Sequence, residues 1–70
     1  MNERLKALRS ALGLTQQEFA DRLKIKRGSV ANYEIGRNEP IDAVISLICR
    51  EFSVNEVWLR TGEGGPDNMF

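Results

Sequence analysis

Residues 13–36 read GLTQQEFADRLKIKRGSVANYEIG and contain the clearest helix signals of the chain. Thr15 and Glu18 fit the T-x-x-E capping box, in which each side chain bonds to the other residue's backbone N–H at a helix start. Apolar residues then follow at helical spacing: Phe19, Ala20 and Leu23. This spacing is typical of a helix with one buried face. The sequence therefore predicts a short helix that begins directly after Thr15.

A second short helix is predicted after a tight turn over residues 24–26. The helical run extends over 27–35, and Gly36 ends it. Its own residues stabilise it poorly, because Lys26 is a weak cap and Gly28 in the first turn costs about 0.5–1 kcal/mol relative to alanine. Tertiary contacts must therefore hold this helix in place. Two short helices joined by a tight turn form the helix-turn-helix unit, whose second helix enters the DNA major groove.

Helical signals on both sides extend this unit into an all-helical domain. Leucines at helical spacing predict a helix before it, with Asn2 as the N-cap. Apolar residues from Ile41 to Phe52 predict a fourth helix, and Asn55 can cap a short fifth. We therefore expect a compact five-helix domain over 1–65. We expect 66–70 to be a tail, or the start of a linker to a further C-terminal segment.

The composition argues against several classes of function. The 70 residues include one cysteine and no histidine, so an internal disulfide is excluded and the usual zinc ligands are lacking. Catalysis near neutral pH lacks its usual base, and the acidic residues are scattered over separate elements. No apolar run reaches the roughly 18 residues of a membrane span. We therefore expect a cytoplasmic protein that is not an enzyme and holds neither a metal nor a cofactor.

The charge distribution points to a polyanionic partner. The whole chain is neutral, but residues 22–37 carry five basic residues and one acidic residue, a net charge of +4. Residues 38–70 carry two basic and six acidic residues, a net charge of −4. Such polarity is typical of a protein that presents one face to a polyanion. The basic stretch coincides with the predicted second helix of the helix-turn-helix unit.

Three segments resemble one known family. They are GLTQQEFADRL at 13–23, KIKRGSVANYEIGRNEP at 24–40 and FSVNEVWLRTGEG at 52–64. In this order they are similar to the xenobiotic-response-element (XRE) family of helix-turn-helix regulators, the relatives of phage repressors and Cro proteins. The resemblance covers roughly 3–65. It implies a lambda-repressor-like DNA-binding domain that acts as a homodimer on a two-fold symmetric operator.

The resemblance also implies roles for individual residues. Three side chains would contact base edges in the major groove: Lys26, Arg27 and Asn32. Four residues would contact the DNA backbone: Gln16, Gln17, Ser29 and Arg37. Arg9 and Glu34 match a pair that forms an internal, structural ion pair in this family. The acidic second half would be the dimer side, where Leu47 and Val57 are candidates for apolar contacts.

Two departures from the family pattern leave a second hypothesis open. Lys24 stands where the family often has a turn glycine, and a left-handed backbone there costs on the order of 1 kcal/mol. Gly28 stands where relatives often carry a polar base reader, so it either lets the DNA approach closely or leaves one base pair unread. The sequence predicts a transcription regulator that represses by operator occupancy. The alternative is a protein-interaction module, such as an antitoxin, adaptor or antirepressor, built on the same fold.

Overall fold

The structure, a computed structural model, describes residues 1–70. Its elements in chain order are α1 (Asn2–Ala11), α2 (Gln16–Leu23), α3 (Arg27–Glu34), α4 (Asp42–Phe52), α5 (Glu56–Thr61) and the 3-10 turn η1 (Pro66–Asn68). The predicted all-helical class with five α-helices is confirmed. None of these helices combines the length and the apolar character that crossing a membrane requires.

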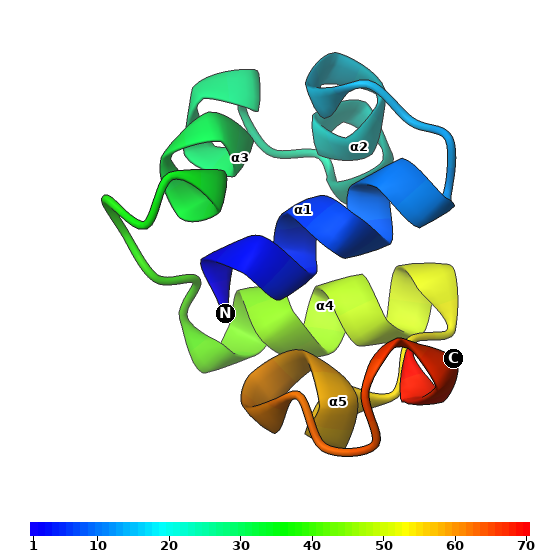
Figure 1. The fold of residues 1–70 in the computed structure, drawn as a ribbon. Helices are drawn as coiled ribbons and strands as arrows, with labels where there is room; N and C mark the ends of the chain where they lie inside the picture. The colour runs from blue at the N-terminus through cyan, green and yellow to red at the C-terminus, as the bar shows by residue number, and fades with distance from the viewer.

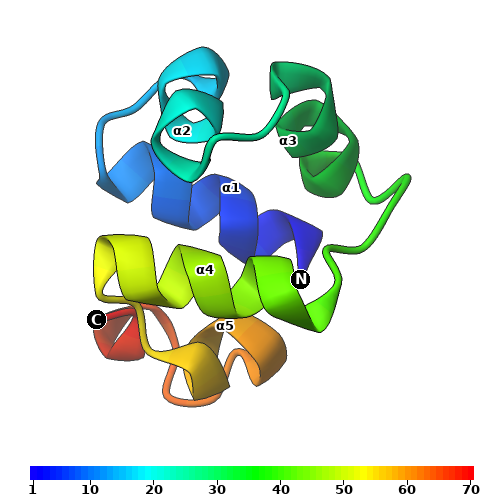
Figure 2. The same ribbon diagram turned by 180° about the vertical axis from the view of Figure 1, so that it is seen from behind.

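The helices are stacked so that α2 and α3 lie together at one end of the molecule and α5 lies at the other (Figure 1). The view from behind shows the same order, with α1 and α4 between the two ends (Figure 2). Helix α3 packs on α1 and α2, and α4 packs on α2 and α5. The helix-turn-helix unit is therefore supported from one side, while its other side is left open to solvent.

A single core of 13 buried apolar residues joins the helices. Its members are Leu5, Leu8, Phe19, Ala20, Leu23, Val30, Ile45, Ile48, Phe52, Val54, Trp58, Leu59 and Met69. The rings of Phe19 and Phe52 stack with centroids 4.9 Å apart, and the Arg22 guanidinium lies 5.1 Å from the centre of the Phe52 ring. This aromatic contact fixes α2 against the C-terminal end of α4.

Local signals predicted the helix ends of the helix-turn-helix unit well. Both hydrogen bonds of the Thr15–Glu18 capping box are present. Lys24 ends α2 in the left-handed conformation, with φ of 58°. Helix α3 begins at Arg27 as predicted and ends one residue earlier than predicted, with Ile35 as its C-cap. The sequence prediction of two short helices and a tight turn is thus correct.

Two expectations outside this unit were wrong. Asn2 does not cap α1 but lies in its first turn, where its side-chain amide donates to the backbone oxygen of Glu34 at 3.4 Å. Ile41 is not on the buried face of α4 but precedes the helix as its N-cap and is 69% exposed. Separately, the segment after residue 65 packs on the domain, since Met69 is buried and its carbonyl accepts a hydrogen bond from the Asn55 N–H at 2.9 Å.

Candidate nucleic-acid interface

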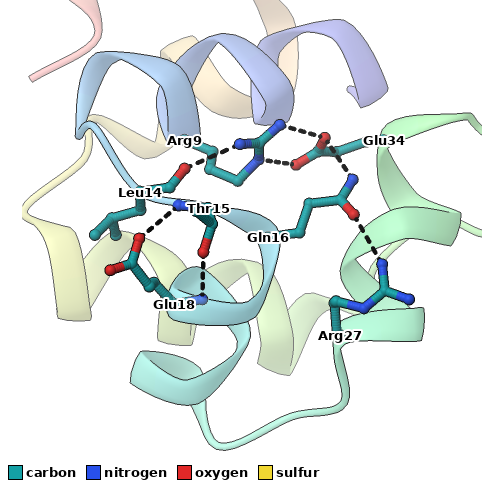
Figure 3. A network of polar contacts seen from close by, with 7 residues as sticks. All are labelled: Arg9, Leu14, Thr15, Gln16, Glu18, Arg27 and Glu34. Carbon is teal, nitrogen blue, oxygen red and sulfur yellow. Dashed lines mark hydrogen bonds and ion pairs between the residues drawn. The ribbon is translucent and has the colours of Figure 1, made fainter.

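The predicted DNA-contacting residues lie at the start of α2, along α3 and in the segments that flank α3. Gln16 and Arg27 are the first residues of their helices. Their side chains meet, because Arg27 Nη1 donates to Gln16 Oε1 at 3.3 Å (Figure 3). The structure therefore brings together one predicted backbone contact and one predicted base reader.

The remaining predicted contacts are also accessible to solvent, although to different extents. Lys26 is the exposed N-cap residue of α3, while Ser29 and Asn32 on the helix are partly buried. Arg37 is exposed beyond the other end of α3, and its backbone N–H donates to the carbonyl of Asn32 at 2.9 Å. Gln17 is exposed, and its amide donates to Asp21 Oδ1 at 2.8 Å.

A buried ion pair lies directly beneath this surface. Arg9 Nε and Nη2 donate to the two carboxylate oxygens of Glu34 at 2.7 and 3.1 Å. The Glu34 side chain is only 3% exposed and that of Arg9 is 16% exposed. Arg9 Nη1 also donates to the Leu14 carbonyl at 2.9 Å, so the guanidinium fixes the turn before α2 as well. The ion pair that the family resemblance implied is therefore present, between α1 and α3.

The Glu34 carboxylate also accepts a hydrogen bond from Gln16. Gln16 Nε2 lies 3.2 Å from Glu34 Oε1, so a continuous chain of polar contacts runs from Arg9 through Glu34 and Gln16 to Arg27 (Figure 3). Burial raises the pKa of Glu34, but the hydrogen bonds from Arg9 and Gln16 outweigh it and hold the pKa below its ordinary value. Glu34 is therefore ionised at neutral pH.

The ion pair between Arg9 and Glu34 removes a negative charge from the surface around α3. Glu34 is the single acidic residue of 22–37, and its charge is neutralised from below by Arg9. Arg22 pairs with Glu51 of α4 and so belongs to the support of the unit. The four remaining basic residues of the stretch are exposed and pair with no carboxylate: Lys24, Lys26, Arg27 and Arg37. The surface around α3 thus presents four positive charges that form no ion pair.

The outward face of α3 is nearly free of large polar side chains. Gly28, Asn32 and Ile35 are spaced to lie on one side of the helix, away from the buried Val30 and Glu34. A methyl group added at Gly28 would meet no atom within 4 Å, so the fold itself does not require glycine there. Ile35 is 67% exposed. An apolar side chain at this place can contact the methyl group of thymine.

Sequence reasoning missed two features of this surface. The sequence pattern predicts Ile35 only as the last residue of the helix, although its spacing from Gly28 by seven residues already places it on the same face. The link between Glu34 and Gln16 was missed because it joins two helices, and no local pattern reports such a contact. The ion pair itself was found through the family resemblance and not from the spacing.

Curated relatives of this chain include an antitoxin and a transcriptional activator. Antitoxin PezA of Streptococcus pneumoniae serotype 4 (strain ATCC BAA-334 / TIGR4) is 37% identical over 57 residues, which are 81% of this chain and 36% of PezA. The HTH-type transcriptional activator BcrR of Enterococcus faecalis is 34% identical over 62 residues, which are 89% of this chain and 30% of BcrR. This chain thus spans about a third of the length of either relative. No solved structure matches the chain significantly.

A family profile described as a helix-turn-helix domain matches residues 2–65, which is nearly the whole chain. The matched range contains α1 to α5, with the helix-turn-helix unit formed by α2 and α3. The match agrees with the geometry of two short helices that a tight turn joins and that α1 supports from below. This chain is a member of that helix-turn-helix domain family.

Proposed function

We propose that this chain is the DNA-binding domain of a sequence-specific transcription regulator of the Cro/C1 type, which represses by occupying an operator. The observation that carries the proposal is the set of four exposed basic residues without carboxylate partners around α3: Lys24, Lys26, Arg27 and Arg37. Helix-turn-helix units insert the N-terminal part of their second helix into the major groove. In this chain that part begins with Lys26 and Arg27. A regulator of this kind acts in the cytoplasm and needs neither a metal nor a cofactor.

The base-reading role belongs to the residues that α3 presents to the groove. Arg27 suits guanine, whose O6 and N7 accept a bidentate pair of hydrogen bonds, and Asn32 suits adenine. Lys26 directly precedes Arg27 and can reach the same base edges. Because Gly28 carries no side chain, the surface holds few base readers. DNA shape and phosphate contacts then supply the rest of the specificity.

Phosphate contacts would come from residues at the edge of this surface. Gln16 and Gln17 each use one amide hydrogen within the chain, so the second hydrogen of each NH2 group is free to bond a phosphate oxygen. Ser29 in the first turn of α3 can add a hydroxyl contact. Arg37 lies just beyond the opposite end of the helix and would meet the backbone there.

A second copy of the chain would bind through α4 and α5. Ile41 is 69% exposed and Val57 is 50% exposed. Both lie beside the ion pair between Asp42 and Arg60. Asp42 directly follows Ile41 in the sequence, and Arg60 lies one helical turn after Val57 in α5. Leu47, the other predicted contact, is partly buried against the core and contributes less. A homodimer would place its two copies of α3 about 34–36 Å apart, on successive major grooves of a two-fold symmetric site.

Selection from a pool of random-sequence duplexes tests the proposal. The recovered duplex and unselected DNA are then compared in a salt titration. We expect a palindromic duplex that binds at least ~10³-fold more tightly than unselected DNA, with an affinity that falls steeply with salt. Failure to enrich any duplex, together with no salt-sensitive binding near ~50 mM salt, would overturn the proposal.

Two substitutions separate base reading from phosphate binding. Arg27→Ala should weaken binding of the selected duplex by about 1–3 kcal/mol and relax the preference at one base pair. Arg37→Ala should weaken selected and unselected DNA alike and reduce the salt slope by about one. Equal losses on both kinds of DNA for Arg27→Ala would contradict its base-reading role.

A protein-interaction function is the second candidate. The relative PezA is named an antitoxin, and residues 38–70 of this chain, whose helix α5 lies on the side of the molecule opposite α3, carry a net charge of −4. A basic partner protein would fit that side. Failure of the duplex selection, followed by recovery of a partner that protects α4 and α5 from hydrogen exchange, would favour this function.

A further inference from the structure

We propose that Glu34 is a positioning residue for DNA recognition: its buried carboxylate orients the Gln16 amide, and Gln16 in turn holds Arg27 at the entrance of α3. This inference rests on the proposed DNA-binding function and deepens it. It gives the Arg9–Glu34 ion pair a second role besides joining α1 to α3. Three successive contacts lead from the buried ion pair outward to the guanidinium of Arg27 (Figure 3).

The carboxylate of Glu34 is held in a fixed place. Arg9 binds both of its oxygens, and the same guanidinium is anchored to the Leu14 carbonyl. A two-pronged bond between arginine and a carboxylate fixes orientation as well as distance. The remaining acceptor capacity of Glu34 Oε1 faces the first residue of α2.

An ionised carboxylate can only accept hydrogen bonds, and this fixes which way the Gln16 amide points. Its NH2 group must face Glu34, where Nε2 lies 3.2 Å from Oε1. The amide oxygen then necessarily points away from Glu34. The opposite orientation would place two acceptors against each other beneath the surface. Glu34 thus determines that α2 offers an acceptor, and not a donor, to the start of α3.

Arg27 donates to this acceptor at 3.3 Å. The contact orients the guanidinium without neutralising it, because the amide oxygen carries no formal charge. Arginine has five N–H donors, so most of them stay free for a guanine edge or a phosphate. Immobilising a flexible side chain at an interface costs about 2- to 10-fold in affinity, and an arginine that is ordered beforehand avoids part of that cost.

If the Arg9–Glu34 pair were purely structural, sequence discrimination would respond differently to substitution of Gln16. If Arg9 and Glu34 only join helices, cutting the contact between Gln16 and Arg27 should not change how well the protein discriminates between DNA sequences. If Glu34 orients Arg27 through Gln16, discrimination must fall when the contact is cut, even though the ion pair remains. The ratio of affinities for the selected and the unselected duplex measures discrimination. A change in phosphate binding weakens both duplexes equally and therefore cancels in this ratio.

A double-mutant cycle of Gln16→Met with Arg27→Ala tests the proposal. Gln16→Met keeps the length of the side chain and leaves the Arg9–Glu34 pair in place. We expect it to lower the affinity ratio about 2- to 10-fold in the parent chain and to have almost no further effect in the Arg27→Ala background. The matched control is the cycle of Gln16→Met with Arg37→Ala, where the two effects should multiply. If Gln16→Met lowers the affinity ratio by the same factor with and without Arg27, as it should with and without Arg37, the proposal is overturned.

A second readout needs no DNA. In the free protein, ¹⁵N relaxation of the Arg27 side chain should show more order than that of Arg37, which is exposed and makes no side-chain hydrogen bond. Gln16→Met, and Glu34→Gln where that variant folds, should lower the order of Arg27 to the level of Arg37. Equal mobility of the two side chains in the parent chain would overturn the proposal.

The two experiments separate the failure of this inference from the failure of the proposed function. If a duplex is selected but Gln16→Met and Arg27→Ala lower the affinity ratio independently, the DNA-binding function stands and Glu34 has no role in recognition. Failure to select any duplex would remove the DNA-binding function, and the role of Glu34 in recognition with it. The relaxation measurement would then still decide whether Glu34 orders Arg27.

Discussion

Helices α2 and α3 have the same length of eight residues but are stabilised in opposite ways. Helix α2 has a complete capping box at Thr15, a left-handed end at Lys24 and a buried apolar stripe. Helix α3 has no side-chain cap, no acidic residue in its first turn and only Val30 as a buried apolar residue. Its other buried side chain is the charged Glu34, which Arg9 and Gln16 hold from outside the helix.

This difference shows that different residues stabilise α3 and are free to contact a ligand. Helix α2 uses its first turn for its own capping. Helix α3 is anchored through Val30 and Glu34, so its first residues need not stabilise it. Lys26, Arg27 and Gly28 are thereby left available for a ligand. Substitutions that remove the anchor of α3 should therefore cost more stability than substitutions in its first turn.

Removing the anchor of α3 should have the largest effect. Arg9→Met leaves the Glu34 carboxylate buried without its partner, which costs about 3–5 kcal/mol of unfolding free energy. Urea unfolding measures the loss. The control is Arg22→Met, which removes a more exposed pair with Glu51 and a contact with Phe52 and should cost about 1 kcal/mol. Similar losses for the two variants would contradict the claim that α3 depends on this ion pair.

Removing the N-cap residues should affect only one of the two helices. Thr15→Ala deletes the side-chain half of the capping box of α2 and should cost about 1 kcal/mol. Lys26→Ala at the equivalent position of α3 should leave the unfolding free energy nearly unchanged, because Lys26 makes no capping bond. Thermal unfolding of both variants measures this difference. A destabilisation by Lys26→Ala as large as that by Thr15→Ala would contradict the comparison.

The turn between the two helices contains strain that can be relieved. Lys24 has φ of 58°, which is unfavourable for a residue with a side chain, so Lys24→Gly should stabilise the fold by up to about 1 kcal/mol. Lys26→Gly, two residues later in extended backbone, should give no such gain. The midpoints of chemical unfolding provide the measurement. A loss of stability on Lys24→Gly would show that the left-handed turn costs less than assumed.

The smallest effect is expected at Gly28. Because a Cβ there would meet no neighbouring atom and the residue is helical, Gly28→Ala should stabilise α3 by about 0.5–1 kcal/mol. A loss of stability would contradict this structural assignment. Binding of the selected duplex then decides between the two interpretations of this glycine. Weaker binding means that DNA approaches closely there, and unchanged binding means that one base pair is unread.

The sequence predicted the helix-turn-helix unit with nearly correct bounds because its signals are local. Thr15 and Glu18 are close in sequence, and Gly36 ends α3 wherever the rest of the chain lies. The errors fall where packing between distant segments decides. Asn2, which was expected to cap α1, instead turns toward the end of α3 and donates to the backbone oxygen of Glu34. No periodicity of the chain reports such contacts.

The candidate site could be predicted as a set of residues but not as a connected network. The resemblance named Arg9 and Glu34 as a pair and assigned Gln16 and Arg27 to DNA contacts. That these four side chains form one continuous chain depends on how α1, α2 and α3 approach one another. The same approach also determines the charge of the surface, because pairing with Arg9 neutralises the one acid among the basic residues.

An amide-resolved NMR titration of the chain with the selected duplex shows whether DNA binds at α3. We expect the largest shifts at the start of α2, along α3 and in the segment to Arg37. Resonances of α5 should move little, except for those near Val57 if two copies associate on the DNA. Shifts concentrated on α4 and α5, with α3 unaffected, would contradict the account and show that the acidic side is the binding surface.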